Sequence, residues 1–258
     1  MTIKQMDTYQ KNFNILMGLV QRNLVGKYKN SVLGFGWNFI LPILLIVIYY
    51  IVFTELRTSN LDNLWLYLAT GIFPLNFMIT NLNVGCSCIV GNSNIVKKMY
   101  FPRELLVLSQ IISSFIILLI GVAIVILLSI PTCEINLSIL MLIPALIVSF
   151  IFVAGFVFII SSLVVYVRDL QFAIGTLSII FYFITPIYFE INQTTGVLSE
   201  TILLNPFTYF IELFHQSLFY YNIPNYDCLL IASVISIVTL LIGYYTFKKL
   251  EGGFAERI

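Results

Sequence analysis

Charged residues are scarce in this sequence of 258 residues. Asp, Glu, Lys and Arg together make up 10% of it, whereas a soluble domain carries roughly 25%. Hydrophobic residues make up 60%, and the mean hydropathy is +1.00. This composition excludes a soluble globular protein and predicts a single transmembrane domain over residues 1–258. The first eleven residues are polar, so we expect no cleavable leader.

Groups suited to catalysis or metal binding are also few. The sequence has one histidine, His215, and no cluster of His, Cys, Asp and Glu with metal-ligand spacing. A lone histidine is more often structural than catalytic. Four cysteines do not form a disulfide framework in such a chain, and we interpret them as small buried side chains. Cys133 and Cys228 are the one pair that could share a side of the membrane and bond.

A nucleotide-binding loop is missing as well. The nearest match is "GLVQRNLVGKYKNS", which lacks the first glycine and has Tyr28 where Ser or Thr is required. We therefore expect no catalytic residues, no metal and no cofactor in this chain.

Long apolar runs account for most of the sequence. Crossing the hydrocarbon takes about 20 apolar residues in a helix, because backbone polar groups find no water there. Six runs qualify, and we predict an all-α membrane protein with six transmembrane helices. They cover residues 34–54, 64–85, 105–130, 138–165, 170–189 and 228–247. The third and fourth runs are unusually long, so we expect tilted or broken helices there, with breaks at Pro144 and Gly155 in the fourth.

Ionisable residues are missing from the middle of every predicted span. Carriers driven by protons or sodium usually place charged groups or broken-helix ion sites at that depth. If this chain moves a substrate, the energy therefore comes from a partner.

Positive charge predicts the orientation of the spans. With the N-terminus inside, the inner segments hold twelve of the thirteen Lys and Arg residues, and the outer segments hold Arg57. The positive-inside rule then places both termini in the cytoplasm.

The N-terminal segment 8–30 reads as an amphipathic interface helix. Its apolar stripe consists of Phe13, Leu16, Met17, Val20 and Leu24, and Arg22 lies off that stripe. Such a helix would lie along the inner membrane interface, either as an anchor or as a docking surface. Gly34 and Gly36 would then let the chain turn into the first span.

Two further segments stand out. The cytoplasmic loop 92–102 is polar and basic, and we predict a short helix over 94–100 that Asn92 or Ser93 caps. It is either an ordinary positive-inside loop or a contact for a soluble subunit. The outer segment 190–227 is too apolar for a solvated loop. Within it, residues 195–224 form either two short re-entrant helices, which we favour, or a helical cap on the bundle.

Five stretches together resemble the permease subunit of ABC transporters that export bacterial cell-surface polysaccharides such as O-antigen, capsule and teichoic acid. They are "KYKNSVLGFGWNFILP", "SNIVKKMYFPRELLVLS", "VRDLQFAIGTLSIIFYFITPIYF", "LNPFTYFIELFHQSLF" and "FKKLEGGFAERI". They occur in the family's order over nearly the whole chain. Gly36 departs from the pattern, because a bulkier apolar residue usually precedes the tryptophan.

The resemblance implies the type-2 ABC permease fold and a multi-pass protein of a prokaryotic cytoplasmic membrane. Two copies would form the pore, and two copies of a separate ATPase subunit would bind beneath, with ATP and Mg on that partner. The loop helix would be the coupling helix, and the interface helix would border the ATPase. The implied ATPase contacts are Asn94, Val96, Lys97, Lys98, Met99 and Tyr100. The substrate would be a glycan on a lipid carrier.

Aromatic residues offer a physical basis for moving a glycan, because the apolar C–H faces of sugars stack weakly on aromatic rings. We expect the channel lining to include Tyr182, Phe183, Tyr188, Tyr209 and Phe210. The competing interpretation is an aromatic belt at the membrane interface.

Three other functions remain open at this point. An ABC exporter of drugs or small lipids would share the six-span plan. A membrane-embedded enzyme that modifies a glycan or lipid would need paired acidic residues at one interface, and the inner side has scattered ones. A passive channel would not associate with an ATPase.

Overall fold

The computed structural model describes residues 3–26, 31–56, 63–98, 101–130, 137–191, 194–220 and 226–258. Met99, Tyr100, Cys133 and Arg57, which figure in the predictions above, lie outside these ranges. Within them, every regular element is a helix. The chain is therefore an all-helical membrane protein with several spans.

The helices follow the predicted runs closely. α1 covers Ile3–Val25, α2 Trp37–Glu55, α3 Leu64–Cys86, α4 Ser93–Lys98, α5 Glu104–Ser129, α6 Leu142–Tyr166, α7 Leu170–Ile184, α8 Val197–Leu204, α9 Pro206–Leu218, α10 Tyr226–Glu251 and α11 Phe254–Arg257. Short 3₁₀ turns precede three of them: η2 (Gly34–Gly36), η3 (Val90–Asn92) and η4 (Leu137–Met141).

The helices differ in whether they are long enough to cross a membrane. In the described part of the chain, four segments are long and apolar enough to cross a membrane alone: Gly34–Glu55, Glu104–Ser129, Ser138–Tyr166 and Tyr226–Glu251. A fifth candidate is the pair Leu64–Cys86 and Val90–Lys98, which is bent by 55°. α7 has 15 residues and falls short of a full span.

The predicted helix 170–189 is wrong at its C-terminal end, because α7 stops at Ile184. Thr185 has an extended backbone, with φ −71° and ψ 132°. Pro186 follows it, and a proline disfavours helical geometry in the residue before it. The next residues, Ile187 and Tyr188, are buried although they are not helical.

The predicted breaks at Pro144 and Gly155 are also wrong, since α6 runs unbroken from Leu142 to Tyr166. Gly155 instead faces Gly243 of α10 at a close backbone contact. A β-carbon added at Gly243 would overlap the carbonyl oxygen of Gly155, and one added at Gly155 would overlap the backbone of Thr239 and Leu240. Small residues allow this approach, which is a common way for helices to pack in membranes.

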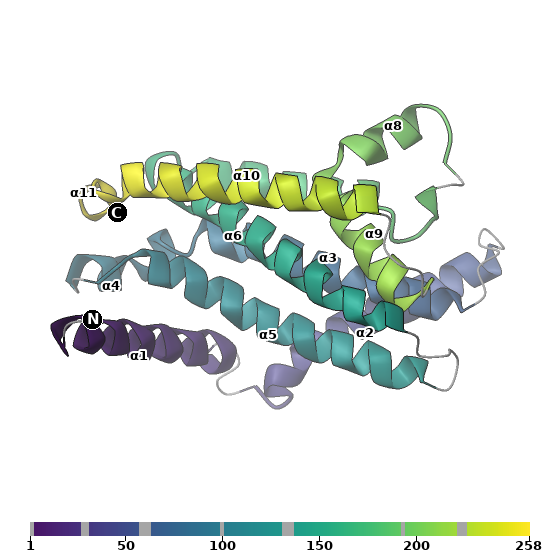
Figure 1. Cartoon of the computed structure of the whole chain (residues 1–258), viewed down its shortest axis with the longest axis horizontal. Helices are drawn as coiled ribbons and strands as arrows, with labels where there is room; N and C mark the ends of the chain where they lie inside the picture. The colour runs from purple at the N-terminus through teal and green to yellow at the C-terminus, as the bar shows by residue number, and fades with distance from the viewer. Residues whose placement is uncertain are drawn as a thin grey trace.

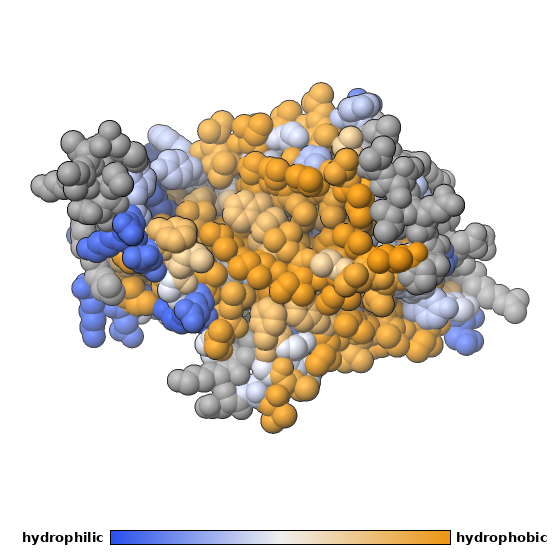
Figure 2. All heavy atoms as spheres, turned by 60° about the horizontal axis from the view of Figure 1, so that its bottom comes forward, coloured by the Kyte–Doolittle hydropathy of each residue, from blue (hydrophilic) through white to orange (hydrophobic). Residues whose placement is uncertain are grey.

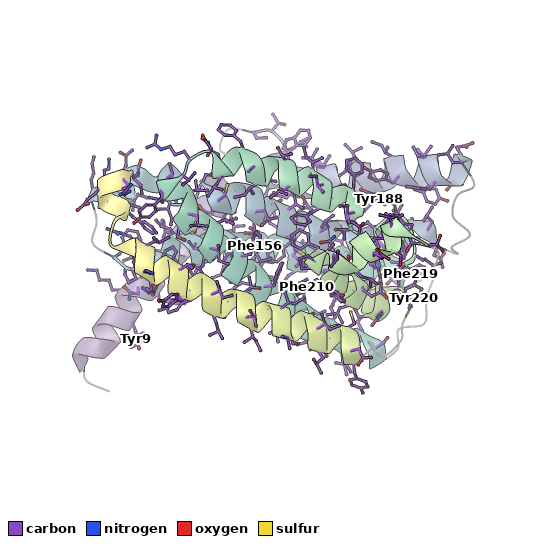
Figure 3. The ribbon with its side chains drawn as sticks, turned by 90° about the horizontal axis from the view of Figure 1, so that it is seen from above. Tyr9, Phe156, Tyr188, Phe210, Phe219 and Tyr220 are labelled. Carbon is purple, nitrogen blue, oxygen red and sulfur yellow. The ribbon has the colours of Figure 1, made fainter. Side chains whose placement is uncertain are left out.

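The two ends of the molecule differ. Figure 1 shows both chain termini and α4 at one end, while α8 and α9 lie toward the other. Tyr9 lies at the first end, and Phe219 and Tyr220 lie at the opposite one (Figure 3). Between them a broad apolar band covers the face seen in Figure 2, with hydrophilic residues gathered at the end that carries the termini. We call this the terminal end.

α1 packs obliquely on the first half of α5 (Figures 1 and 3). Within the predicted apolar stripe, Val20 is buried, but Phe13 and Met17 are more than half exposed. Leu19, which the prediction left out, is buried beside Val20. One apolar side of α1 therefore faces the protein and another, including Tyr9, faces outward. Of the two predicted turn glycines, Gly34 has a positive φ of 49°, whereas Gly36 is helical.

The helices α8 and α9 differ in how far they are buried. α9 is buried against α3, α6 and α10, and Phe207, Phe210 and Phe214 are each at most 1% exposed. Asn205 separates it from α8, accepting a hydrogen bond from the Phe207 amide (3.0 Å) and donating one to Thr185 (2.9 Å). α8 itself is largely uncovered, with Val197 80% and Leu204 83% exposed. α9 is thus part of the bundle, and α8 projects from it.

Candidate functional site

A short cationic helix at the terminal end is the first candidate site. α4 begins at Ser93 directly after η3, and the described part of the predicted helix runs to Lys98. Asn94, Lys97 and Lys98 are exposed, whereas Val96 is only 4% exposed. Val96 is therefore unavailable as a partner contact, contrary to the prediction, and anchors α4 to the core. Asn92, proposed as a cap, instead donates to the Cys88 carbonyl oxygen (2.6 Å) and accepts from Arg22 (2.8 Å).

The C-terminal tail is fixed beside this helix. α11 contacts α4 and α6, and Phe254 is fully buried. The Tyr166 hydroxyl donates to the Leu250 carbonyl oxygen (2.9 Å), and Arg103 donates to the backbone and side chain of Glu251. No local sequence pattern predicts this arrangement. The tail, the start of α5 and the end of α6 therefore form one rigid base next to α4.

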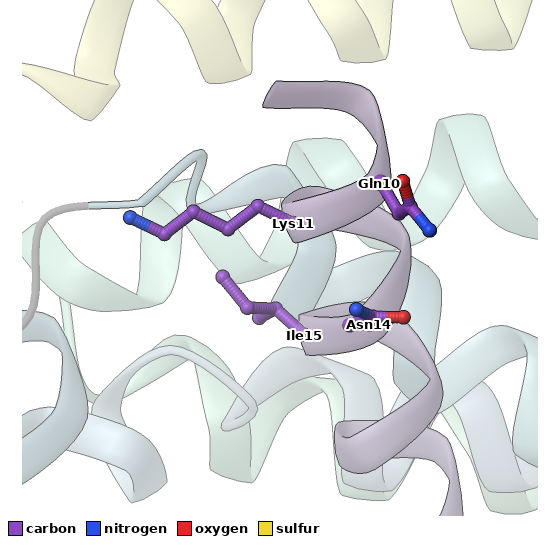
Figure 4. Close-up of a pocket in the computed structure, with 4 residues that line it drawn as sticks. All are labelled: Gln10, Lys11, Asn14 and Ile15. Carbon is purple, nitrogen blue, oxygen red and sulfur yellow. The ribbon is translucent and has the colours of Figure 1, made fainter. Parts of the chain in front are cut away.

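An open groove adjoins that base. Lys11 and Ile15 point to one side of α1, and Gln10 and Asn14 to the other (Figure 4). Lys11 and Ile15 face a groove of about 740 Å³. Its other wall holds Arg103, Glu104, Lys248 and Glu251. Lys248 forms salt bridges with both Glu104 and Glu251. Both signs of charge are thus exposed next to α4.

Three of the five predicted channel aromatics come together near the C-terminal end of α7. The Tyr188 ring lies 4.3 Å from that of Tyr49 and 6.2 Å from that of Tyr182, and the Tyr182 ring lies 6.4 Å from that of Phe183. Phe53 of α2 completes this aromatic cluster, with its ring 5.9 Å from Tyr188. Phe183 is 65% exposed and is the most exposed member of this aromatic cluster.

The other two predicted aromatics lie elsewhere. Phe210 is fully buried in α9 and stacks on Phe152 of α6 with ring centres 4.5 Å apart. It is a core residue, and the prediction that it lines a channel is wrong for this chain. The Tyr209 hydroxyl is bonded to the Leu203 carbonyl oxygen (2.9 Å), so Tyr209 links α9 to α8. Tyr188 and Phe210 are labelled in Figure 3.

A row of polar residues on α3 was missed by the sequence analysis. Asn76, Thr80, Asn83 and Ser87 recur at spacings of four and three, so they share one face of the helix. Asn83 is exposed and accepts a hydrogen bond from Ser178 of α7 (3.2 Å). Asn76 and Thr80 line a small cavity of about 40 Å³ together with Asn38 of α2. The spacing of these amides within an apolar run was the signal that could have revealed this polar row.

His215 is excluded as a reactive group. Its side chain is fully buried in α9, and its ring stacks on Tyr67 with centres 4.0 Å apart. Burial lowers the pKa of His215 to about 3, so the imidazole is neutral near pH 7. The residue packs the bundle, as expected for a single histidine.

The described residues form an all-helical membrane bundle with a cationic helix at one end and a polar row along α3, an arrangement that suits a membrane transport subunit. Residues 15–219 match the family model of the ABC-2 type transporter. The chain belongs to this family and is its non-catalytic membrane subunit.

Characterised relatives match along nearly the whole chain. The chain is 28% identical over 246 residues to the O-antigen export system permease protein RfbA of Klebsiella pneumoniae, covering 95% of both chains. It is 24% identical to the protein of the same name from Myxococcus xanthus, again over 95% of both. A third relative is the capsule polysaccharide export inner-membrane protein CtrC of Neisseria meningitidis, which is 19% identical over 93% of this chain and 92% of its own.

Proposed function

We propose that this chain is the membrane subunit of an ATP-driven exporter that moves a lipid-linked polysaccharide, of the O-antigen or capsule type, across the cytoplasmic membrane. The observation that carries the substrate class is the end-to-end similarity to relatives named as O-antigen and capsule export proteins. A drug exporter and a glycan-modifying enzyme are less favoured, because neither the relatives nor the described side chains point to them.

The path of the chain supports six crossings. Tyr166, at the end of α6, is bonded to Leu250 at the terminal end, whereas α9 lies toward the opposite end. α7 therefore connects the two ends, although its 15 residues extend only about 22 Å against a hydrocarbon core of about 30 Å. The buried, non-helical residues 185–188 would complete the crossing, since irregular backbone is tolerated inside a membrane where protein covers it. By the positive-inside rule, the terminal end would lie in the cytoplasm.

A separate ATPase subunit would dock at this end. α4 presents Lys97 and Lys98 to solvent, and Val96 ties the helix to the core. Because the tail and the start of α5 are fixed beside it, a push on α4 would be transmitted to α5, α6 and α10 together. Movement of the ATPase would thus be transmitted to the spans through α4 and the segments fixed beside it.

The translocation path would run along the polar row between two copies of the chain. An exposed amide such as that of Asn83 is costly against lipid, so we expect it to face water or substrate. α2, beside this row, is almost uncovered, with Pro42 as its one buried residue, which leaves a large apolar face for a second copy. The aromatic cluster lies farther toward the outer end and would contact the glycan as it leaves.

Replacing the exposed amide tests this path. We expect Asn83→Leu to lower export at least about fivefold, because it puts an apolar side chain into a hydrated route. Stability should change by only about 1 kcal/mol, the value of one hydrogen bond. Export is measured as surface polysaccharide per folded permease, with Ile79→Leu, a half-buried apolar residue of the same helix outside the polar row, as the control. Normal export by the Asn83→Leu variant would show that the polar row does not line the translocation path.

The function itself is tested in a strain that lacks this gene. We expect the surface polysaccharide to disappear and its lipid-linked form to accumulate inside the cell. Complementation with the intact gene should restore export. Accumulation of no glycan, with loss of resistance to a drug instead, would favour the drug-exporter alternative.

A further inference from the structure

A polar pocket near the terminal end is not explained by docking or by the polar row alone. It has a volume of about 260 Å³ and lies between α1, α5 and the link from α3 to α4. Arg22, Asn23, Ser87, Asn92 and Gln110 supply its polar lining. We call it the Arg22 pocket. Its size is near the lower limit of small-molecule sites, about 300 Å³, and suits a headgroup rather than a whole glycan.

Arg22 is an exposed residue whose guanidinium group is oriented by one hydrogen bond. Its Nη2 atom donates to the Oδ1 atom of Asn92 (2.8 Å), and Asn92 is itself fixed by its bond to the Cys88 carbonyl oxygen. A guanidinium group has five N–H donors in a rigid fork, so this bond leaves most of them for another acceptor. Such a pre-oriented fork matches the geometry of a phosphate.

The rest of the lining favours an anion as well. Among the described residues, no Asp or Glu lines this pocket, so nothing there neutralises Arg22. The amide groups of Asn23 and Gln110 make only long bonds, to Ser109 (3.3 Å) and Ser114 (3.4 Å). Each amide nitrogen carries two hydrogens and can donate again. The pocket therefore combines one cation with several neutral donors.

The surroundings indicate that the ligand carries an apolar chain. Val84 and Leu106 give the pocket an apolar part of its lining, and Val84 is 39% exposed. Ser87 is at once part of the pocket and the last member of the polar row. Asn92 directly precedes Ser93, where α4 begins. A headgroup bound here would thus lie between the docking helix and the start of the path.

We propose that the Arg22 pocket binds the phosphate of a lipid headgroup at the inner membrane surface. Two sources share this chemistry, a polyprenyl diphosphate carrier and an ordinary anionic phospholipid. Assigning the phosphate to the carrier rests on the proposed function, whereas the phosphate site does not.

The test uses the full chain in complex with its ATPase subunit, in nanodiscs of phosphatidylcholine. A short-chain polyprenyl diphosphate is titrated by calorimetry, with the polyprenol of equal chain length as the phosphate-free probe. We expect the diphosphate to bind and the polyprenol to bind at least about tenfold more weakly. Arg22→Ala should weaken diphosphate binding at least about tenfold, and Arg22→Lys by less, because lysine keeps the charge but not the fork. Lys11→Ala, an exposed cation of the same helix outside this pocket, should bind as the unmodified protein does.

Nanodiscs that also contain phosphatidylglycerol distinguish the two sources. Diphosphate binding that is unchanged by phosphatidylglycerol assigns the pocket to the carrier, and full competition assigns it to bulk phospholipid. If Arg22→Ala does not fold, Gln110→Leu takes its place, with the same expected direction. Equal diphosphate affinity in the unmodified protein, Arg22→Ala and Gln110→Leu would overturn the proposal. Loss of export in the gene deletion is measured separately, so failure of this site would leave the proposed function intact.

Discussion

Reversing both charges of α4, in the double variant Lys97→Glu, Lys98→Glu, is expected to abolish the coupling between ATP hydrolysis and export. Both side chains are exposed at the terminal end, while Val96 between the helix and the core stays in place. A surface of the ATPase that complements two cations would meet two anions, and juxtaposed like charges cost several kcal/mol. We expect permease-stimulated ATP hydrolysis and polysaccharide export each to fall at least about tenfold.

The matched control is Lys249→Glu, an exposed cation at the same end but on α10. It should reduce activity much less, and both variants should unfold at the same temperature as the unmodified protein. If the α4 variant stimulates hydrolysis and exports normally, the energy enters through some other surface. If Lys249→Glu is equally damaging, the effect is one of overall charge.

The second large effect is expected at the contact between α6 and α10. Gly243→Ala places a β-carbon against the carbonyl oxygen of Gly155, and a backbone atom cannot rotate away as a side chain can. The two helices would have to separate along the most extensive helix contact of the bundle. We expect a loss of about 3 kcal/mol in the free energy of unfolding, which lowers the melting temperature by roughly 6–12 °C. Gly155→Leu should be worse.

Gly175→Ala provides the matched comparison for this prediction. Gly175 lies in α7, and a β-carbon there would meet no atom within 4 Å. Alanine is favoured over glycine in a helix by about 1 kcal/mol, so this variant should keep or slightly raise the melting temperature. Thermal unfolding of the purified variants in detergent measures both. Equal melting temperatures for Gly243→Ala and Gly175→Ala would show that the helices are not held at this distance.

Sequence periodicity and apolar length were enough to predict most helices to within a few residues. The run 64–85 corresponds to Leu64–Cys86 and the run 105–130 to Glu104–Ser129, because long apolar stretches have few alternatives in a membrane. The short helix before Pro102 was also predicted, from its polar residues. The early end of α7 could have been predicted from Pro186, because a proline disfavours helical geometry in the residue before it, here Thr185.

Features that depend on distant partners were harder to predict. Gly155 was interpreted as a break because its partner, Gly243, lies 88 residues later in the chain. Phe210 and Tyr188 are both aromatic and near the outer end, but only packing determines that one stacks in the core and the other joins an aromatic cluster. The Arg22 pocket joins α1, the α3–α4 link and α5, and no local pattern brings these together.

We propose that a separate ATPase subunit drives this membrane subunit. The most direct test is to measure ATP hydrolysis in nanodiscs that hold the purified chain alone or together with its ATPase subunit. We expect the chain alone to hydrolyse no more ATP than empty nanodiscs, and the complex to hydrolyse ATP and export glycan. Hydrolysis by the chain alone, or export that persists when the ATPase subunit is catalytically inactive, would contradict a subunit driven from outside.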